Sequence, residues 1–173
     1  DVSSTEEEIQ INPRQAQAVL VKFEPIELTS PKVIISEINY NSSSKQNPGD
    51  WLELHNTGKT AVSLDGWILT DEADRGHFVF SSGAVIPSNG YVVLARKPSS
   101  FKRVFPGVTP IGPLKFGLGN SGDRLFLYDA PGALVDQAEY DDKNPWPNEP
   151  NVEGFTLERV YELGHKNWSL STS

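Results

Sequence analysis

The sequence contains no cysteine among its 173 residues. A disulfide framework, a metal site with thiolate ligands and a cysteine nucleophile are therefore excluded. Without disulfides the fold must depend on an apolar core. A chain of 173 residues is long enough for one domain with a substantial core, or for one domain plus an arm.

Methionine is absent as well, so the sequence has no initiator residue. We expect the chain to be a processed product or a segment of a longer protein, with any targeting signal removed. No apolar run approaches the roughly 20 residues that a membrane-spanning helix needs.

Positive charge is scarce, since 15 lysines and arginines face 23 aspartates and glutamates and the formal net charge is −8. A negative field repels phosphate backbones and favours solubility. This balance disfavours a nucleic-acid partner, although a local basic patch could still bind one.

The sequence does contain short runs of alternating apolar residues, separated by segments rich in serine, asparagine, proline and glycine. Alternation of period two predicts strands, and the segments between them predict turns. In the first run the predicted faces carry Ile34, Ser36, Ile38 and Tyr40 on one side and Val33, Ile35, Glu37 and Asn39 on the other. In the next run Leu52 and Leu54 alternate with Trp51.

Later segments continue this pattern. The nearly continuous apolar run at 91–95 predicts a strand that is covered on both faces and lies near the centre of a sheet. Helical spacing between Phe101 and Phe105, after a serine that could cap the segment, predicts one or two helical turns. The segments at 124–129 and 134–140 predict a hairpin.

The hairpin turn has the sequence Ala-Pro-Gly-Ala. It places Pro131 and Gly132 at the two central positions that a type II turn favours. About nine short strands with turns every eight to twelve residues and one short helical turn predict an all-β, antiparallel β-sandwich. We expect Trp67 inside its core.

A series of sequence blocks spans Val33 to Ser173. In chain order these blocks are SEINYN, GDWLELHN, LDGWILTDE, VIPSNGYVVLAR, LGNSGDRLFLYDAPGALVDQAEYDDKNPWP, GFTLERV and NWSLS. Their order resembles the lamin-tail domain family in its bacterial form. The resemblance implies an immunoglobulin-like fold and a binding module. It also implies an extracytoplasmic location, because such domains often accompany exported proteins.

The chain divides into two parts. We predict that residues 1–32 form an N-terminal arm or linker with an edge strand, and that residues 33–173 form the lamin-tail-like β-sandwich domain. The edge strand is predicted from the alternation at 19–23, which ends at Pro25 because proline cannot donate to a sheet.

The densest acidic cluster consists of Asp136, Glu139, Asp141 and Asp142. Carboxylates at a loop rim could bind Ca²⁺ or act as a general acid and base. However, the spacing of a calcium loop is missing, and Asp136 and Glu139 fall on opposite faces of a predicted strand. We therefore interpret these carboxylates as solvated and predict no metal, no cofactor and no catalytic residue.

Three glycines reproduce the spacing G-x-G-x-x-G, at Gly117, Gly119 and Gly122. A strand rather than a helix is predicted after them, so the context of a dinucleotide-binding fingerprint is missing. The three histidines are too scattered for a local metal motif.

One patch combines basic and aromatic residues, and its members are Arg96, Lys97, Phe101, Lys102, Arg103 and Phe105. Such a patch could contact phosphates while its rings stack on bases, and the family resemblance adds that some lamin tails bind DNA. The alternative is that both phenylalanines pack the helical turn on the sandwich.

Two tryptophans are further candidates. Trp51 lies on the strand face opposite Leu52 and Leu54, and Trp146 lies between two prolines. Each could be an exposed platform for a sugar ring or a peptide, or could fold back as a lid over the core.

The sequence thus predicts a non-catalytic interaction module of a larger exported or cell-surface protein, with a protein or glycan partner. The predicted partner-binding residues are Trp51, Trp146, Phe101, Lys102 and Arg103. The alternatives are an accessory domain of an enzyme whose catalytic part precedes the chain, a hydrolase that uses the acidic rim, and a nucleic-acid-binding domain.

Overall fold

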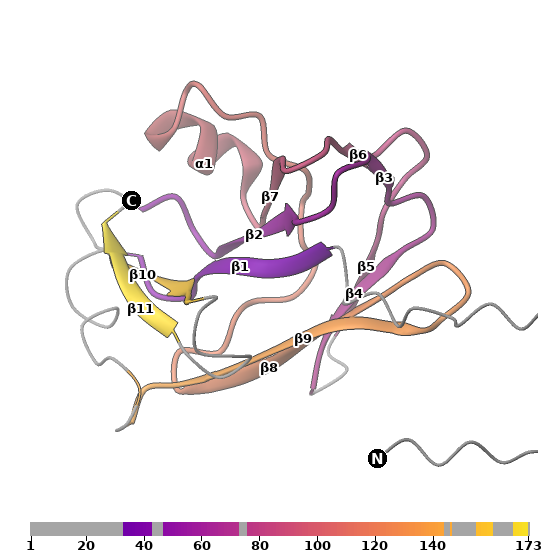
Figure 1. Ribbon diagram of the computed structural model, residues 1–173. Helices are drawn as coiled ribbons and strands as arrows, with labels where there is room; N and C mark the ends of the chain where they lie inside the picture. The colour runs from indigo at the N-terminus through magenta and orange to yellow at the C-terminus, as the bar shows by residue number, and fades with distance from the viewer. Residues whose placement is uncertain are drawn as a thin grey trace, which may run out of the picture.

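The chain folds into two antiparallel sheets packed face to face, which confirms the predicted β-sandwich (Figure 1). The computed structural model describes residues 33–42, 47–72, 76–143, 146, 155–160 and 168–172. The first sheet has the order β11 (Trp168–Thr172), β10 (Phe155–Arg159), β1 (Val33–Asn39), β2 (Trp51–Asn56) and β7 (Tyr91–Ala95). The second has the order β5 (His77–Val79), β4 (Ile68–Asp71), β8 (Gly122–Tyr128) and β9 (Leu134–Asp141).

A short ribbon of β3 (Val62–Ser63) and β6 (Val85–Ile86) completes the described strands. The described residues therefore contain eleven strands instead of the nine or so that the sequence predicts. The single helix α1 (Pro98–Val104) lies on the side of the five-stranded sheet that faces away from β8 and β9 (Figure 1). No helix in this part of the chain is long and apolar enough to cross a membrane. The predicted arm at 1–32 lies outside the described residues.

The core lies between the two sheets. Leu52 and Leu54 of β2 and Leu125 and Leu127 of β8 belong to it and are fully buried. Each of these strands places alternate residues inward, as period two requires. The hairpin of β8 and β9 is confirmed. Trp67 packs against the core but is only partly buried.

Strand β1 departs from strict alternation. Its pairing with β2 shifts register between Ile35 and Glu37, so one extra residue is inserted there. A β-bulge of this kind reverses which residues face the core on its two sides. Val33, Ile35 and Ile38 consequently share the inner face, and the face assignment from the sequence is wrong beyond Ile35.

Strand β7 is buried from Val93 to Ala95 but lies at the edge of its sheet, so the predicted central position is wrong. The segment at Ile111 runs along the free edge of β7, where its N–H donates to Val93 O (2.8 Å) and its carbonyl accepts from Ala95 N–H (2.9 Å). Helix α1 covers the outer face next to it through Phe101. Because the Ile111 segment and α1 cover β7, this edge strand has the apolar composition of a central strand.

Two local predictions are also corrected. The hairpin turn closes with a hydrogen bond from Gly132 N–H to Asp129 O, so Ala130 and Pro131 are its central residues instead of Pro131 and Gly132. Helix α1 begins with Pro98 after Lys97, and no side chain caps it, so the predicted serine cap is wrong. Proline suits this first position because its missing N–H would have no helical partner.

Candidate interaction surface

The structure buries two of the aromatic residues that the sequence singles out. Trp51 is 4% exposed and packs edge-on against Phe101 of α1 and against Phe105, which directly follows the helix; the ring centroids lie 5.6 and 6.1 Å from that of Trp51. Of the two alternatives for Trp51, the exposed platform is therefore wrong, because the helix covers its ring. Phe101 is buried in the same cluster.

The other predicted partner-binding residues do not form one surface with Trp51 and Phe101. Lys102 and Arg103 are exposed on α1, but the neighbouring rings face the sheet and are not available for stacking on bases. Arg96 is paired with Asp50 at 3.0 Å. Trp146 packs against the main core and is partly buried, at a different cluster from Trp51. The five predicted residues thus form no single surface.

The acidic cluster is divided, since Glu139 and Asp141 line one hollow and Asp136 does not. Asp136 is buried between the sheets, whereas Glu139 is exposed on the other face of β9. Within the described residues, no group of three or more histidine, aspartate or glutamate side chains is placed to hold a metal ion. The interpretation of Asp136 as a solvated carboxylate is wrong.

A different surface emerges on the four-stranded sheet, on the face that points away from the five-stranded sheet; we call it the outer face. Strand pairing aligns one residue from each strand in a line across it. This apolar row consists of Val79 (β5), Ile68 (β4), Tyr128 (β8) and Leu134 (β9). Val79 and Leu134, at its two ends, are 49% and 51% exposed.

The next line across the outer face, the middle row, consists of His77, Thr70, Phe126 and Gln137. Phe126 and Tyr128 follow each other along β8 with stacked rings, their centroids 6.3 Å apart. Aromatic rings give a large contact area at a small entropic cost. The two rings therefore form the centre of a continuous apolar patch.

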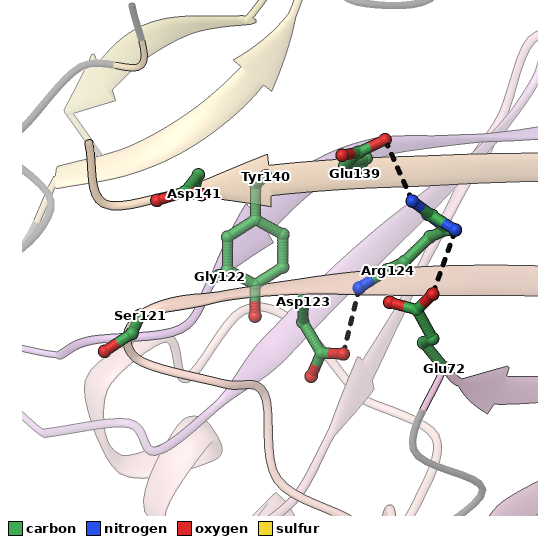
Figure 2. Close-up of a pocket in the computed structure, with 8 residues that line it drawn as sticks. All are labelled: Glu72, Ser121, Gly122, Asp123, Arg124, Glu139, Tyr140 and Asp141. Atoms are coloured by element: carbon green, nitrogen blue, oxygen red, sulfur yellow. Dashed lines mark hydrogen bonds and ion pairs between the residues drawn. The ribbon is translucent and has the colours of Figure 1, made fainter. Parts of the chain in front are cut away.

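The third line is charged and consists of Glu72, Arg124 and Glu139. The guanidinium of Arg124 lies between the two carboxylates, at 3.0 Å from Glu72 and 3.6 Å from Glu139 (Figure 2). These side chains border a hollow of about 340 Å³ whose lining also includes Ser121, Gly122 and Asp141. One end of the outer face is thus polar and recessed, and the other is apolar.

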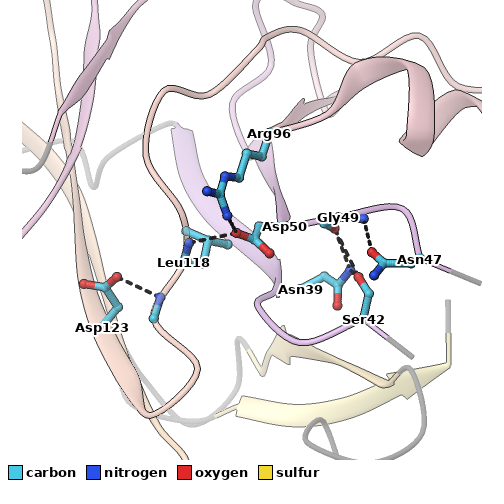
Figure 3. A network of polar contacts seen from close by, with 9 residues as sticks. Asn39, Ser42, Asn47, Gly49, Asp50, Arg96, Leu118 and Asp123 are labelled. Atoms are coloured by element: carbon cyan, nitrogen blue, oxygen red, sulfur yellow. Dashed lines mark hydrogen bonds and ion pairs between the residues drawn. The ribbon is translucent and has the colours of Figure 1, made fainter. Parts of the chain in front are cut away.

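The loop that leads into β8 is held by polar contacts beneath this hollow. Asp50 accepts hydrogen bonds from Arg96 (3.0 Å) and from Leu118 N–H (3.2 Å), and Asp123 accepts one from Gly119 N–H (3.0 Å) (Figure 3). These carboxylates explain why the loop needs no regular secondary structure. They also fix the start of β8 and with it the position of Arg124.

The inner neighbour of the hollow is Tyr140, whose ring stacks on Tyr40 in the core with centroids 4.7 Å apart. Burial raises the pKa of the Tyr140 hydroxyl, and the nearby carboxylates of Asp123 and Asp50 raise it further. The phenol therefore stays neutral and serves as part of the core.

A signal for this surface is present in the sequence. Phe126 and Tyr128 alternate with Leu125 and Leu127, so two aromatic residues occupy the face opposite the core. Large aromatic residues at outward positions of an antiparallel sheet are the informative observation, because such positions are usually polar.

The two packed antiparallel sheets define an immunoglobulin-like module. The model of the Lamin Tail Domain family matches residues 27–142, and the chain belongs to this family. This confirms the resemblance noted in the sequence, and the family is one of non-catalytic immunoglobulin-like modules. A comparison with curated proteins found no match.

Proposed function

We propose that the chain is an interaction module that holds a protein partner on the outer face of its four-stranded sheet. One observation carries the proposal. The apolar row extends across all four strands, and its ends, Val79 and Leu134, are about half exposed. Contiguous apolar side chains on the surface of a domain mark interaction sites.

The chemistry of the face favours a protein over a glycan. Val79, Ile68 and Leu134 offer no hydrogen-bonding groups to sugar hydroxyls. Buried centres of protein interfaces are instead enriched in aromatic residues and depleted of charge. Phe126 and Tyr128 match that composition, and the charged row lies to one side as an interface rim would.

A display library of short peptides provides the test, with a glycan array in parallel. The wild-type chain should enrich peptides whose binding is lost in Phe126→Ser and in Leu134→Ser. The matched control is Val108→Ser, which removes an exposed valine away from this face. Far-UV circular dichroism confirms that each variant is folded.

Peptides that bind all three variants equally would overturn the proposal, because their site would lie elsewhere. Binding to glycans alone would also overturn it. Loss of binding in both outer-face variants, with retention in Val108→Ser, would support it.

A further inference from the structure

The carboxylates at one end of the outer face indicate which charge the partner carries. We infer that the partner presents a lysine or arginine side chain to the hollow beside Arg124, and apolar side chains to the neighbouring rows. This inference rests on the proposed function, since it describes the occupant of the same surface.

The hollow carries an excess of negative charge on its outer side. Glu72 and Glu139 are 60% and 58% exposed, so their carboxylates are accessible to a ligand even though both contact Arg124. Asp141 and Asp123 add two further carboxylates to the lining. Among the described lining residues, four carboxylates against one guanidinium leave room for a second cation.

The existing guanidinium has its positive charge already matched. The guanidinium of Arg124 lies between the carboxylates of Glu72 and Glu139, at 3.0 and 3.6 Å. An incoming anion would meet the flanking carboxylates before it reached Arg124. An incoming cation would instead reduce the repulsion among these carboxylates.

The spacing along β8 defines how such a partner would lie. Tyr128, Phe126 and Arg124 are successive outward positions of one strand, about 7 Å apart. An extended segment has the same period, so its alternate side chains can contact the three rows in turn. The expected pattern is two apolar residues and then a basic one, each separated by one residue.

The ring of Phe126 adds to the site because it lies next to the hollow on the same face. The aliphatic stem of a lysine or arginine can pack on this ring while its charged end lies between the carboxylates. A cation beside an aromatic face gains further attraction. The contact area and the charge therefore favour the same side chain.

A second copy of the chain is a poorer occupant. Each chain has a formal net charge of −8, so two copies repel each other. A nucleic acid is disfavoured for the same reason, since its phosphates would face the carboxylates of the hollow.

The experiment uses peptides enriched by the wild-type chain, synthesised with their basic residue as arginine, citrulline or glutamate. Citrulline keeps the shape of arginine without its charge. The arginine peptide should bind about fivefold more tightly than the citrulline peptide, the upper range for an exposed ion pair. Added salt should shrink this preference while the citrulline peptide stays bound.

Substitutions that reverse the charge of one glutamate test whether the preference for arginine arises at the hollow. Glu139→Lys should abolish the preference for arginine over citrulline, whereas Glu158→Lys, an exposed glutamate on the other sheet, should preserve it. Titration calorimetry on each folded variant gives both affinities. The salt dependence of the wild-type chain is a second test that needs no variant.

The outcomes separate this inference from the proposed function. Peptides that depend on Phe126 and Leu134 but contain no basic residue, or bind equally with citrulline, would overturn the inference alone. Absence of any peptide that depends on those residues would overturn both. A dimer in sedimentation velocity that Leu134→Ser dissociates would make the occupant a second copy and would also overturn the inference.

Discussion

Arg159 of β10 and Asp136 of β9 form an ion pair that joins the two sheets through the core. The guanidinium donates to both carboxylate oxygens, at 2.8 and 3.1 Å, and the two side chains are only 4% and 3% exposed. Asp136 also accepts the N–H of Ile35 in β1 (2.8 Å). Arg159 also donates to Gln137 O (2.9 Å), and its guanidinium lies 5.2 Å from the centre of the Trp168 ring.

This pair should be sensitive to the loss of one partner. We expect Asp136→Leu to reduce the free energy of unfolding by about 3–5 kcal/mol, because it leaves a buried cation without a counter-charge. The double variant Asp136→Leu with Arg159→Met should lose much less than the sum of the two single losses. Guanidinium-induced unfolding measures all three variants.

The exposed ion pair between Arg124 and Glu72 is the control for this comparison of single and double variants. Glu72→Gln removes a partner of Arg124 at the surface, where an ion pair contributes about 0–1 kcal/mol. Additive losses at Asp136 and Arg159 would show that the two side chains are not coupled as the structure implies.

A row of three carboxylates crosses the other sheet and should make stability depend on pH. Glu37 is paired directly with Glu53 on one side and with Glu158 on the other. Burial raises the pKa of Glu37 and of Glu53, repulsion from neighbouring glutamates raises it further, and hydrogen bonds from Thr156 and Ser36 partly oppose this.

The direction of the effect follows from proton linkage. The folded state holds its protons to higher pH than the unfolded state, whose glutamates titrate near 4.5. The contribution to stability is therefore fully present below that pH and is lost as the pH rises through the raised pKa. We expect Glu37→Gln with Glu53→Gln to remove this loss and to stabilise the chain at pH 7 by about 0.5–1 kcal/mol.

Thermal unfolding between pH 4 and pH 8 checks this prediction, with Glu139→Gln on the outer face as the control. The side-chain oxygen of glutamine can still accept the hydrogen bonds from the hydroxyls of Thr156 and Ser36, so each substitution removes the charge and keeps the hydrogen bond. An unchanged pH profile in the double variant would contradict the prediction.

Gly122 should be intolerant of any side chain. Its φ is +112°, and a Cβ there would lie 2.8 Å from the carbonyl oxygen of Tyr140. We expect Gly122→Ala to cost about 1–3 kcal/mol, the usual range for strained backbone. Gly107→Ala is the control because nothing lies within 4 Å of its added Cβ, and it should change stability by less than about 0.5 kcal/mol. Equal melting temperatures of the two variants would refute this account of the glycine.

Trp51 should contribute to stability and not to partner binding. Its ring joins α1 to the five-stranded sheet, so Trp51→Ala should lose about 3–5 kcal/mol in chemical unfolding. Tyr91→Ala removes a ring that is 55% exposed on the same sheet and should lose far less. Peptide binding that is abolished in a folded Trp51→Phe variant would restore this residue as a binding candidate.

The sequence predicts the strands well because each run carries its own period. Leu125 and Leu127, or Leu52 and Leu54, identify an inward face without reference to any other segment. The bulge in β1 escaped prediction because it depends on pairing with β2, and its sequence gives no sign of the extra residue.

The candidate surface could be predicted only in part. The outward positions of Phe126 and Tyr128 are readable from β8 alone, but their neighbours Ile68, Val79 and Leu134 come from other strands. The cover over Trp51 could not be predicted for the same reason, since the helix that provides it begins only at Pro98.

Local periodicity and turn chemistry, which the sequence alone determines, predicted an antiparallel β-sandwich, and the order of its sequence blocks indicated the lamin-tail family. Tertiary structure alone decided which side chains meet: Arg159 with Asp136, α1 with Trp51, and three rows of residues across the outer face. The physical reason is that alternation assigns a residue to a face, whereas strand register and layer packing determine its neighbours.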